Sequence, residues 1–475
     1  MDERNSISDR VGGNYIGGLR YTGGGNPRGI YDPQYTNLAP RLGLTWAPVS
    51  RLVVRAGYGI FYTPAIEFGD YQGLTLNGFT QNTPFVGSVD GITPQNLMSN
   101  PFPTGLLLPP EKAAGDLTNI GLSTNRTERD RPTPYVHQWT FGLQYQLPGN
   151  MVIETAYIGN HGVKVPFGAG FRRNQLRPEN LSLGAALLEP VPNPFFGVIT
   201  TGPLSGRTVP RGQLLRPYPH FDAVNAAQPP AGMSSYNSFV VSANKRFSNG
   251  LQFLVSFTAS KYITNTEGHE GWTNGTAQNV LNYYDTSLEK SLMINDIPRS
   301  FVASYIYELP VGREKRIKPS SSVVDAIVGG WQIAGVSTFK SGFPLAISTA
   351  TNNTNSFGGN QRPNVLRNPF LSERTIDRWF DTGAFAQPAP FTFGNGPRTM
   401  PYVRAHGINN FDATVQKYWP LGAEDRKLQF RAEFYNFFNR TGFYAPNIQF
   451  GNPNFGRITG ALPARSIQLG LKFYW

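Results

Sequence analysis

The chain has 475 residues, a formal net charge of +12 and no cysteine, which excludes disulfides, thiol nucleophiles and cysteine-ligated metals. Charged residues make up only 15% of the sequence, whereas about 25% is usual for a soluble protein. The lysine and arginine residues are spread along the chain, which argues against a nucleic-acid-binding surface.

The start of the chain, residues 1–36, shows no clear periodicity. We expect a loop or a partial strand there. The first residues, "MDERNSISDRVGG", lack the apolar centre of a secretory signal. If the protein is exported, we therefore expect this start to be truncated or mis-assigned.

From residue 37 onward, apolar and polar residues alternate in segment after segment. In "RLVVRAGYGIFY", for example, Leu52, Val54 and Ala56 would share one face, and Val53, Arg55 and Gly57 the other. A strict period of two predicts a strand with an apolar and a polar face. The predicted strands, about eleven or twelve, cover residues 39–48, 51–62, 136–147, 151–159, 237–247, 251–260, 299–310, 329–339, 409–420, 428–438 and 466–475.

The links between these segments alternate in length. Short links follow Pro48, Leu147, Phe247 and Trp419, and long links follow Tyr62, Val165, Thr264, Ser341 and Phe438. This asymmetry is typical of an outer-membrane barrel, with tight turns on one side and long loops on the other. A soluble β-sandwich, the alternative, has no such rule and rarely carries long structureless loops.

One link, residues 310–329, is longer than the others on the short side. It contains "GREKRIKP", which predicts a solvated turn, and "SSVVDAIVGG", which predicts a helical turn. Aromatic residues near the ends of the apolar faces favour the membrane interpretation, because aromatic girdles mark both interfaces of such barrels. They are Trp46, Tyr62, Trp139, Tyr307, Trp419 and Trp475.

Two segments, "FRAEFYNFFNRTGF" and "FGRITGALPARSIQLGLKFYW", resemble the end of TonB-dependent outer-membrane receptors. "GGWQIAGVSTFKSGFPLAIST" and "PYVHQWTFGLQYQLPGNMVIETAYIGNHG" resemble the Oar-like subgroup. The resemblance covers residues 37–475. It implies an all-β fold in the cell outer membrane: an antiparallel transmembrane β-barrel of the 22-stranded type, present as its C-terminal half, with long extracellular loops.

The same resemblance implies energised import of a bulky, scarce ligand such as a metal chelate, cobalamin or a glycan. The energy would come through TonB, ExbB and ExbD. We find no plug domain, TonB box or carboxypeptidase-regulatory-like domain in this sequence, so we expect contact with TonB only through segments absent here. The alternative is a structural or adhesive surface protein without energised import. The expected partners are outer-membrane lipid, the barrel-assembly machinery and an extracellular ligand.

The final segment, "SIQLGLKFYW", is a candidate recognition signal. The resemblance implies that the barrel-assembly machinery reads its alternating apolar residues, and edge pairing with a partner strand would provide the contact. The alternative is that they only face lipid. They are Ile467, Leu469, Leu471, Phe473 and Trp475.

No spacing in the sequence predicts an enzyme, a cofactor site or a metal site, and "EGHEGW" lacks the second histidine of a zincin helix. Four charged residues on the polar faces are predicted to face the lumen: Arg55, Glu154, Arg431 and Glu433. Pairing across strands is the default role for such inward charges, and holding a plug or contacting a substrate are the alternatives. Loop aromatics could clasp a ligand or pack the loops together. They are Tyr71, Phe79, Phe85, Phe195, Phe196, Phe357, Phe391 and Phe393.

Overall fold

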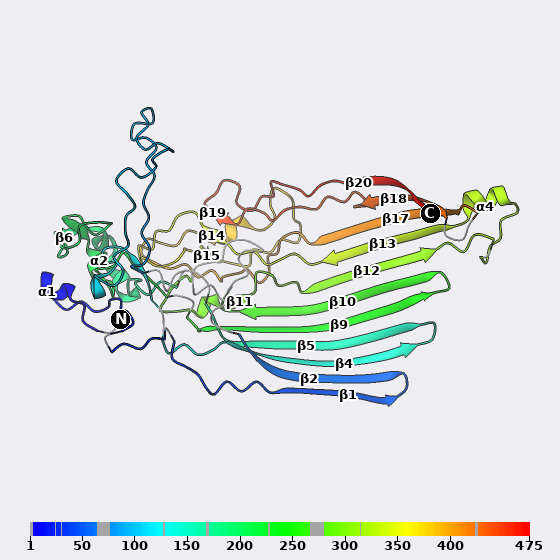
Figure 1. Cartoon of the computed structure of the whole chain (residues 1–475), viewed down its shortest axis with the longest axis horizontal. Helices are drawn as coiled ribbons and strands as arrows, with labels where there is room; N and C mark the ends of the chain where they lie inside the picture. The colour runs from blue at the N-terminus through cyan, green and yellow to red at the C-terminus, as the bar shows by residue number, and fades with distance from the viewer. Residues whose placement is uncertain are drawn as a thin grey trace.

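The computed structural model contains one large antiparallel sheet in which eleven strands follow one another in chain order (Figure 1). The structure describes residues 3–23, 25–29, 31–63, 77–126, 129–167, 171–226, 229–266, 280–313, 315–422 and 426–475. The eleven strands are β1 (Arg41–Val49), β2 (Leu52–Tyr62), β4 (Tyr135–Leu147), β5 (Met151–Val165), β9 (Gly232–Ser248), β10 (Leu251–Thr264), β12 (Arg299–Glu308), β13 (Trp331–Lys340), β17 (Ile408–Pro420), β18 (Lys427–Tyr435) and β20 (Ser466–Tyr474). A short strand, β11 (Ser291–Leu292), pairs with β10.

These strands confirm the eleven segments predicted from the alternation, with differences only at their ends. β9 begins at Gly232, five residues before the predicted start, so this strand is longer than predicted. β18 ends at Tyr435, three residues early, because Asn436 adopts a positive φ of 55° and starts a turn. A positive φ takes the chain out of the extended conformation that a strand requires.

The register places the apolar positions of neighbouring strands on one side of the sheet, called here the apolar face. Phe257 lies opposite Val241 on one side and Phe301 on the other, and Phe301 lies opposite Phe339. Among the described residues, every fully buried hydrophobic side chain except that of Ala432 lies outside the eleven strands. Within the described residues, the apolar face therefore has no second sheet packed on it, as the face of a β-sandwich would have.

Short and long connections leave opposite ends of the sheet, called the turn end and the loop end (Figure 1). At the turn end, Gly149 and Asn150 have φ values of 79° and 59°, and Asn249 and Gly250 have values of 52° and 75°. Tight hairpins need such positive values, which glycine and asparagine adopt most easily. The predicted alternation of short and long links is thus confirmed where the turns are described.

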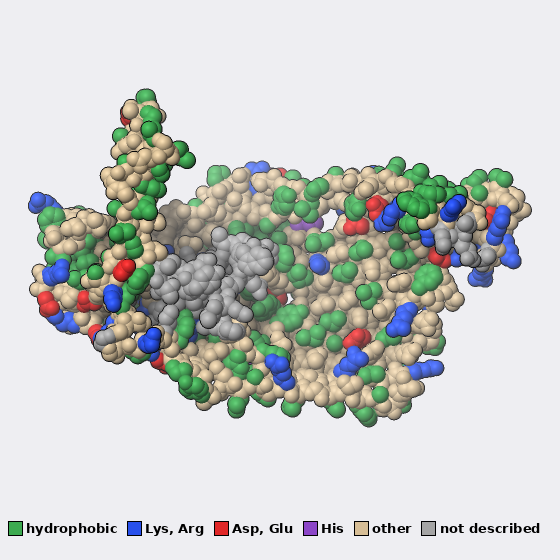
Figure 2. Space-filling view, viewed as in Figure 1, with side chains coloured by type: hydrophobic (Ala, Val, Ile, Leu, Met, Phe, Trp, Pro, Cys, Tyr) green, Lys and Arg blue, Asp and Glu red, His purple; other side chains and the backbone are tan. Residues whose placement is uncertain are grey.

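The loop end contains secondary structure that the sequence did not predict. Four small two-stranded sheets form there: β3 (Ser123–Arg126) with β8 (Ala223–Ala226), β6 (Pro190–Pro192) with β7 (Thr208–Pro210), β14 (Ser348–Thr349) with β19 (Gln449–Phe450), and β15 (Asn364–Val365) with β16 (Phe385–Ala386). Short helices join them: η3 (Gly115–Leu117), η4 (Pro178–Leu188), α2 (Arg211–Leu214), η6 (Ser287–Glu289) and η7 (Thr382–Ala384). Residues 80–110 stand away from the rest of the molecule, with hydrophobic side chains along them (Figures 1 and 2).

The N-terminal segment docks onto these loops through helix α1 (Ile7–Val11). The backbone and hydroxyl of Ser6 donate to the Asp116 carboxylate at 2.7 and 2.6 Å, and the Asn5 amide donates to the Asp116 carbonyl at 2.7 Å. Ile7 is buried in a cluster with Phe195 and Ile199. Residues 3–17 therefore belong to the folded loop assembly.

The sheet has two edges, β1 and β20. Among the described residues, the two strands form no ladder with each other, and each pairs with one neighbour only. Both strands run from the loop end to the turn end (Figure 1), as follows from eleven antiparallel strands in sequence. No described helix is both long and apolar enough to cross a membrane.

Candidate functional site: the loop cap and the polar face

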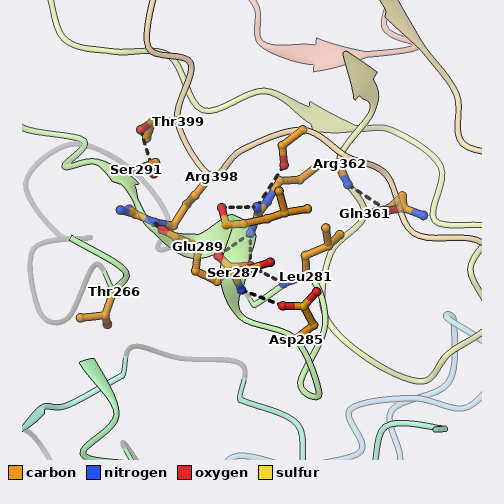
Figure 3. Close-up of polar contacts among 12 residues, drawn as sticks. Thr266, Leu281, Asp285, Ser287, Glu289, Ser291, Gln361, Arg362, Arg398 and Thr399 are labelled. Atoms are coloured by element: carbon orange, nitrogen blue, oxygen red, sulfur yellow. Dashed lines mark hydrogen bonds and ion pairs between the residues drawn. The ribbon is translucent and has the colours of Figure 1, made fainter. Parts of the chain in front are cut away.

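The loops after β10 and β13, residues 280–298 and 342–407, form one folded body that we call the loop cap. Its centre is an ion pair between Glu289 on η6 and Arg362, at 2.5 Å (Figure 3). Both side chains are only 1% exposed. A buried charge is costly unless a partner of opposite sign and hydrogen bonds compensate it.

The hydrogen bonds around this pair supply that compensation. The Glu289 carboxylate also accepts from the Leu281 amide at 3.0 Å, and Arg362 donates to the Gly396 carbonyl at 3.2 Å. Arg398 is buried beside them and donates to the carbonyls of Glu289 and Thr264 at 3.0 and 2.9 Å (Figure 3). The two loops are therefore fixed to each other and to the end of β10.

A second ion pair ties the cap to the sheet. Arg404 lies 2.5 Å from Asp296, and the same carboxylate accepts from the backbone amide of Tyr262 on β10 at 2.7 Å. The cap also has a hydrophobic core, because seven hydrophobic residues of the loop after β13 form a buried cluster. They are Leu345, Ile347, Phe380, Ala384, Phe385, Met400 and Val403.

The predicted loop aromatics divide into two groups. Phe195 is buried beside α1, and three others pack on a cluster that includes Leu176; these three are Phe357, Phe391 and Phe393. They hold loops together. Phe79, Phe85 and Phe196 have exposed rings that a ligand could reach. Tyr71 lies outside the described residues.

The polar face carries the four charged residues singled out from the sequence. Arg431 and Glu433 form an ion pair at 2.5 Å along their own strand, rather than across strands as expected. Arg55 and Glu154 are exposed, and within the described part of the chain neither has an ion-pair partner within 4.0 Å. The structure thus pairs two of the four residues with each other and shows no ion pair within the described residues for the other two.

Sequence reasoning missed a hydrogen-bonded chain that crosses four strands of this face. Gln416 bonds to Gln332, Gln429 donates to Gln416 at 2.9 Å, and the Tyr474 hydroxyl donates to Gln429 at 2.9 Å. The only sequence signal is that each residue occupies a polar position of its strand. A hollow of about 580 Å³ lies on the same sheet, and its lining includes Gln252, Leu254, Ser304, Ile306, Val336 and Asp412.

No group of three or more histidine, cysteine, aspartate or glutamate side chains in the described ranges could hold a metal ion. His269 of "EGHEGW" lies outside them. The loop cap and the polar face of the sheet are the two parts of the candidate site.

The sequence matches the family model "Outer membrane beta barrel domain" over residues 3–468, and the chain belongs to this family. The apolar face is accordingly the lipid-facing surface of a protein of the cell outer membrane. In this class the short turns lie on the periplasmic side and the long loops outside the cell. The chain matches no curated protein.

Among solved structures, the chain is similar to the siderophore receptor PiuA from Acinetobacter baumannii, with 8% identity and a TM-score of 0.39 over 92% of this chain and 36% of that one. It is also similar to the outer membrane transporter YddB from Escherichia coli, with 12% identity and a TM-score of 0.42 over 92% and 40%. It is similar as well to the ferric preacinetobactin receptor BauA from Acinetobacter baumannii, with 10% identity and a TM-score of 0.36 over 92% of this chain and 36% of that one. The chain spans 40% or less of the length of each of these proteins.

A buried histidine joins the N-terminal segment to the loops. His220 is fully buried against Tyr15 and Phe195, and its Nε2–H donates to the Gly17 carbonyl at 3.1 Å. Its Nδ1 has no hydrogen-bond partner in the described part of the chain. Burial lowers the pKa of His220 from 6.5 to about 4, although the Gly17 hydrogen bond and the charge of Asp116 act in the opposite direction.

We expect this histidine to make the docking of residues 3–17 sensitive to acid. With residues 3–17 undocked, His220 is exposed and binds a proton as the pH falls through about 6.5, whereas with the segment docked it stays neutral until about pH 4. Stability is therefore lost between these values, by on the order of 3 kcal/mol at most. Hydrogen exchange of residues 3–17 at pH 7 and pH 5 measures this loss of docking stability. The His220→Gln variant should show a much smaller pH effect; an equal effect in both proteins would contradict the assignment to His220.

Proposed function

We propose that this protein supplies the barrel of a TonB-dependent receptor of the Oar-like subgroup, which takes up a bulky, scarce ligand such as a metal chelate or a glycan. The observation that carries this proposal is the loop cap. A buried ion pair holds two of the long loops to each other at the loop end of the sheet. Preorganised loops above a hydrophilic interior suit capture of a large ligand at the cell surface.

The edges of the sheet support the view that further strands complete the barrel. Because β1 and β20 run in the same direction, joining them directly would create a parallel pair in an antiparallel barrel. Two copies of this sheet joined edge to edge would have a parallel pair of strands at each of the two junctions. An odd number of additional strands makes every pair antiparallel, and eleven additional strands would give the 22-stranded type of barrel. Under this proposal the plug and the TonB box also come from outside these residues.

The alternative, a structural or adhesive surface protein without energised import, is favoured by one feature. The projecting residues 80–110 expose several large hydrophobic side chains, including those of Val89, Ile92 and Met98. Exposed apolar groups on an extended loop suit contact with a surface or another cell.

Uptake measurements separate the two functions. Cells with and without the gene encoding the complete protein would be given radiolabelled ferric chelates and labelled oligosaccharides, with and without a protonophore. The proposal expects uptake of at least one ligand to depend on both the gene and the proton gradient. Uptake unchanged by the deletion, together with loss of adhesion, would establish the alternative instead.

A further inference from the structure

The connection between β12 and β13, the long link on the periplasmic side, contains helix α4 (Ser322–Val328). Its position is set by side chains of the lipid-facing surface. The indole N–H groups of Trp331 and Trp419 donate to the carbonyls of Ile327 and Ala326, each at 2.9 Å. Trp331 begins β13, and Trp419 lies at the end of β17. Figure 1 shows α4 at the turn end, beside the C-terminus.

A lysine on the same surface makes the third contact. Lys417 pairs in register with Trp331, so it lies on the apolar face, and it is 2% exposed. Its ammonium group donates to the carbonyl of Ile327 at 3.1 Å and also bonds to that of Gly329. It lies 5.2 and 5.3 Å from the ring centres of Trp331 and Trp419. A lysine on this surface would be costly in lipid, and α4 removes that cost with carbonyls that its last turn leaves free.

Once docked, α4 still exposes an apolar face. The exposed residues Val323, Val324, Ile327 and Val328 follow a spacing that places them on one side of a helix. Val323 and Ile327 are 71% and 64% exposed. On the other side, Asp325 lies 3.4 Å from Arg313. No described residue covers the apolar side of α4.

Basic residues accompany this apolar surface. The link between residues 309 and 330 contains four basic and two acidic residues, a formal charge of +2. Arg313, Lys315, Arg316 and Lys318 are all exposed. Figure 2 shows hydrophobic and basic side chains next to each other at the end of the molecule where α4 lies.

We propose that α4 is an in-plane anchor that inserts its valine and isoleucine side chains into the periplasmic leaflet, while the basic residues of the link bind anionic phospholipid headgroups. The surface is continuous with the lipid-facing surface of the sheet, and tryptophan side chains of that surface fix it at the level where interfacial aromatics gather. An apolar face flanked by basic residues is the composition of helices that lie in a membrane interface.

The absence of native cysteine permits a direct test by single labels. Ile327→Cys and, as a matched control on the opposite side of the helix, Ser322→Cys would carry a spin label in the complete protein reconstituted in vesicles. The vesicles would contain phosphatidylcholine with or without phosphatidylglycerol. We expect the label at position 327 to be protected from a water-soluble relaxation agent and accessible to oxygen, and the label at 322 to show the reverse.

The headgroup contact is tested in the same samples. Arg316→Gln and Lys318→Gln should each reduce the ratio of buried to exposed label at position 327 by about fivefold in phosphatidylglycerol vesicles, with little effect in phosphatidylcholine alone. Equal water access at 322 and 327 would overturn the proposal, as would protection of position 327 that needs an added periplasmic protein. Protection that is indifferent to phosphatidylglycerol would overturn the headgroup contact.

Discussion

The Glu289→Gln variant is expected to open the loop cap, because it leaves the Arg362 guanidinium buried without a carboxylate. Breaking one partner of a buried pair costs about 3–5 kcal/mol, and both side chains here are buried with a 2.5 Å contact. We expect amide exchange in residues 280–298 and 342–407 to accelerate by about a hundredfold or more, while the strands of the sheet keep their protection. Hydrogen exchange resolved by mass spectrometry measures both regions.

Two controls distinguish charge burial from general damage. Asp377 and Arg457 form a 2.6 Å pair whose side chains are 68% and 50% exposed, so Asp377→Asn should cost at most about 1 kcal/mol. Replacing both buried partners, with Glu289→Leu and Arg362→Met together, should restore much of the protection because no lone charge remains. Exchange in Glu289→Gln no faster than in Asp377→Asn would show that the pair does not hold the cap. If the cap does serve ligand capture, ligand affinity should fall with its protection.

Trp475→Asp in the complete protein is expected to remove most of it from the outer membrane. Trp475 follows the edge strand β20, is 84% exposed, and stacks on Phe473 with ring centres 6.0 Å apart. Because the Trp475 side chain is so exposed, replacing it should lower the free energy of unfolding of the sheet only slightly. A large loss of insertion would therefore report recognition of the final strand by the assembly machinery, through the edge pairing that an exposed strand offers.

Membrane fractionation and the heat-dependent gel mobility of folded barrels measure this outcome. Tyr35→Asp is a matched control, since Tyr35 is 89% exposed and lies outside the final strand. Normal outer-membrane levels of Trp475→Asp would show that this residue only faces lipid. The other proposed signal residues, Ile467, Leu469, Leu471 and Phe473, all expose their side chains on the apolar face of β20.

The charged residues of the polar face show where sequence reasoning reached its limit. Arg431 and Glu433 are two residues apart on one strand, so their proximity follows from the period of two. The glutamine chain could not be predicted in the same way. Gln332 and Gln416 become neighbours only through the register of β13 and β17, which the long loop after β13 separates in the chain. No local pattern encodes register across such a loop.

Local sequence patterns are enough to predict the eleven strands, their two faces and the end of the sheet from which the long loops leave. These features follow from residue alternation and turn residues, which act over a few positions of the chain. The loop cap and the place of α4, by contrast, are seen only in the folded structure. Glu289 and Arg362 are 73 residues apart, and α4 is fixed by Trp419, 93 residues from its partner. Such contacts depend on where the folded sheet places segments that are distant in the chain. A local periodic pattern does not encode those positions.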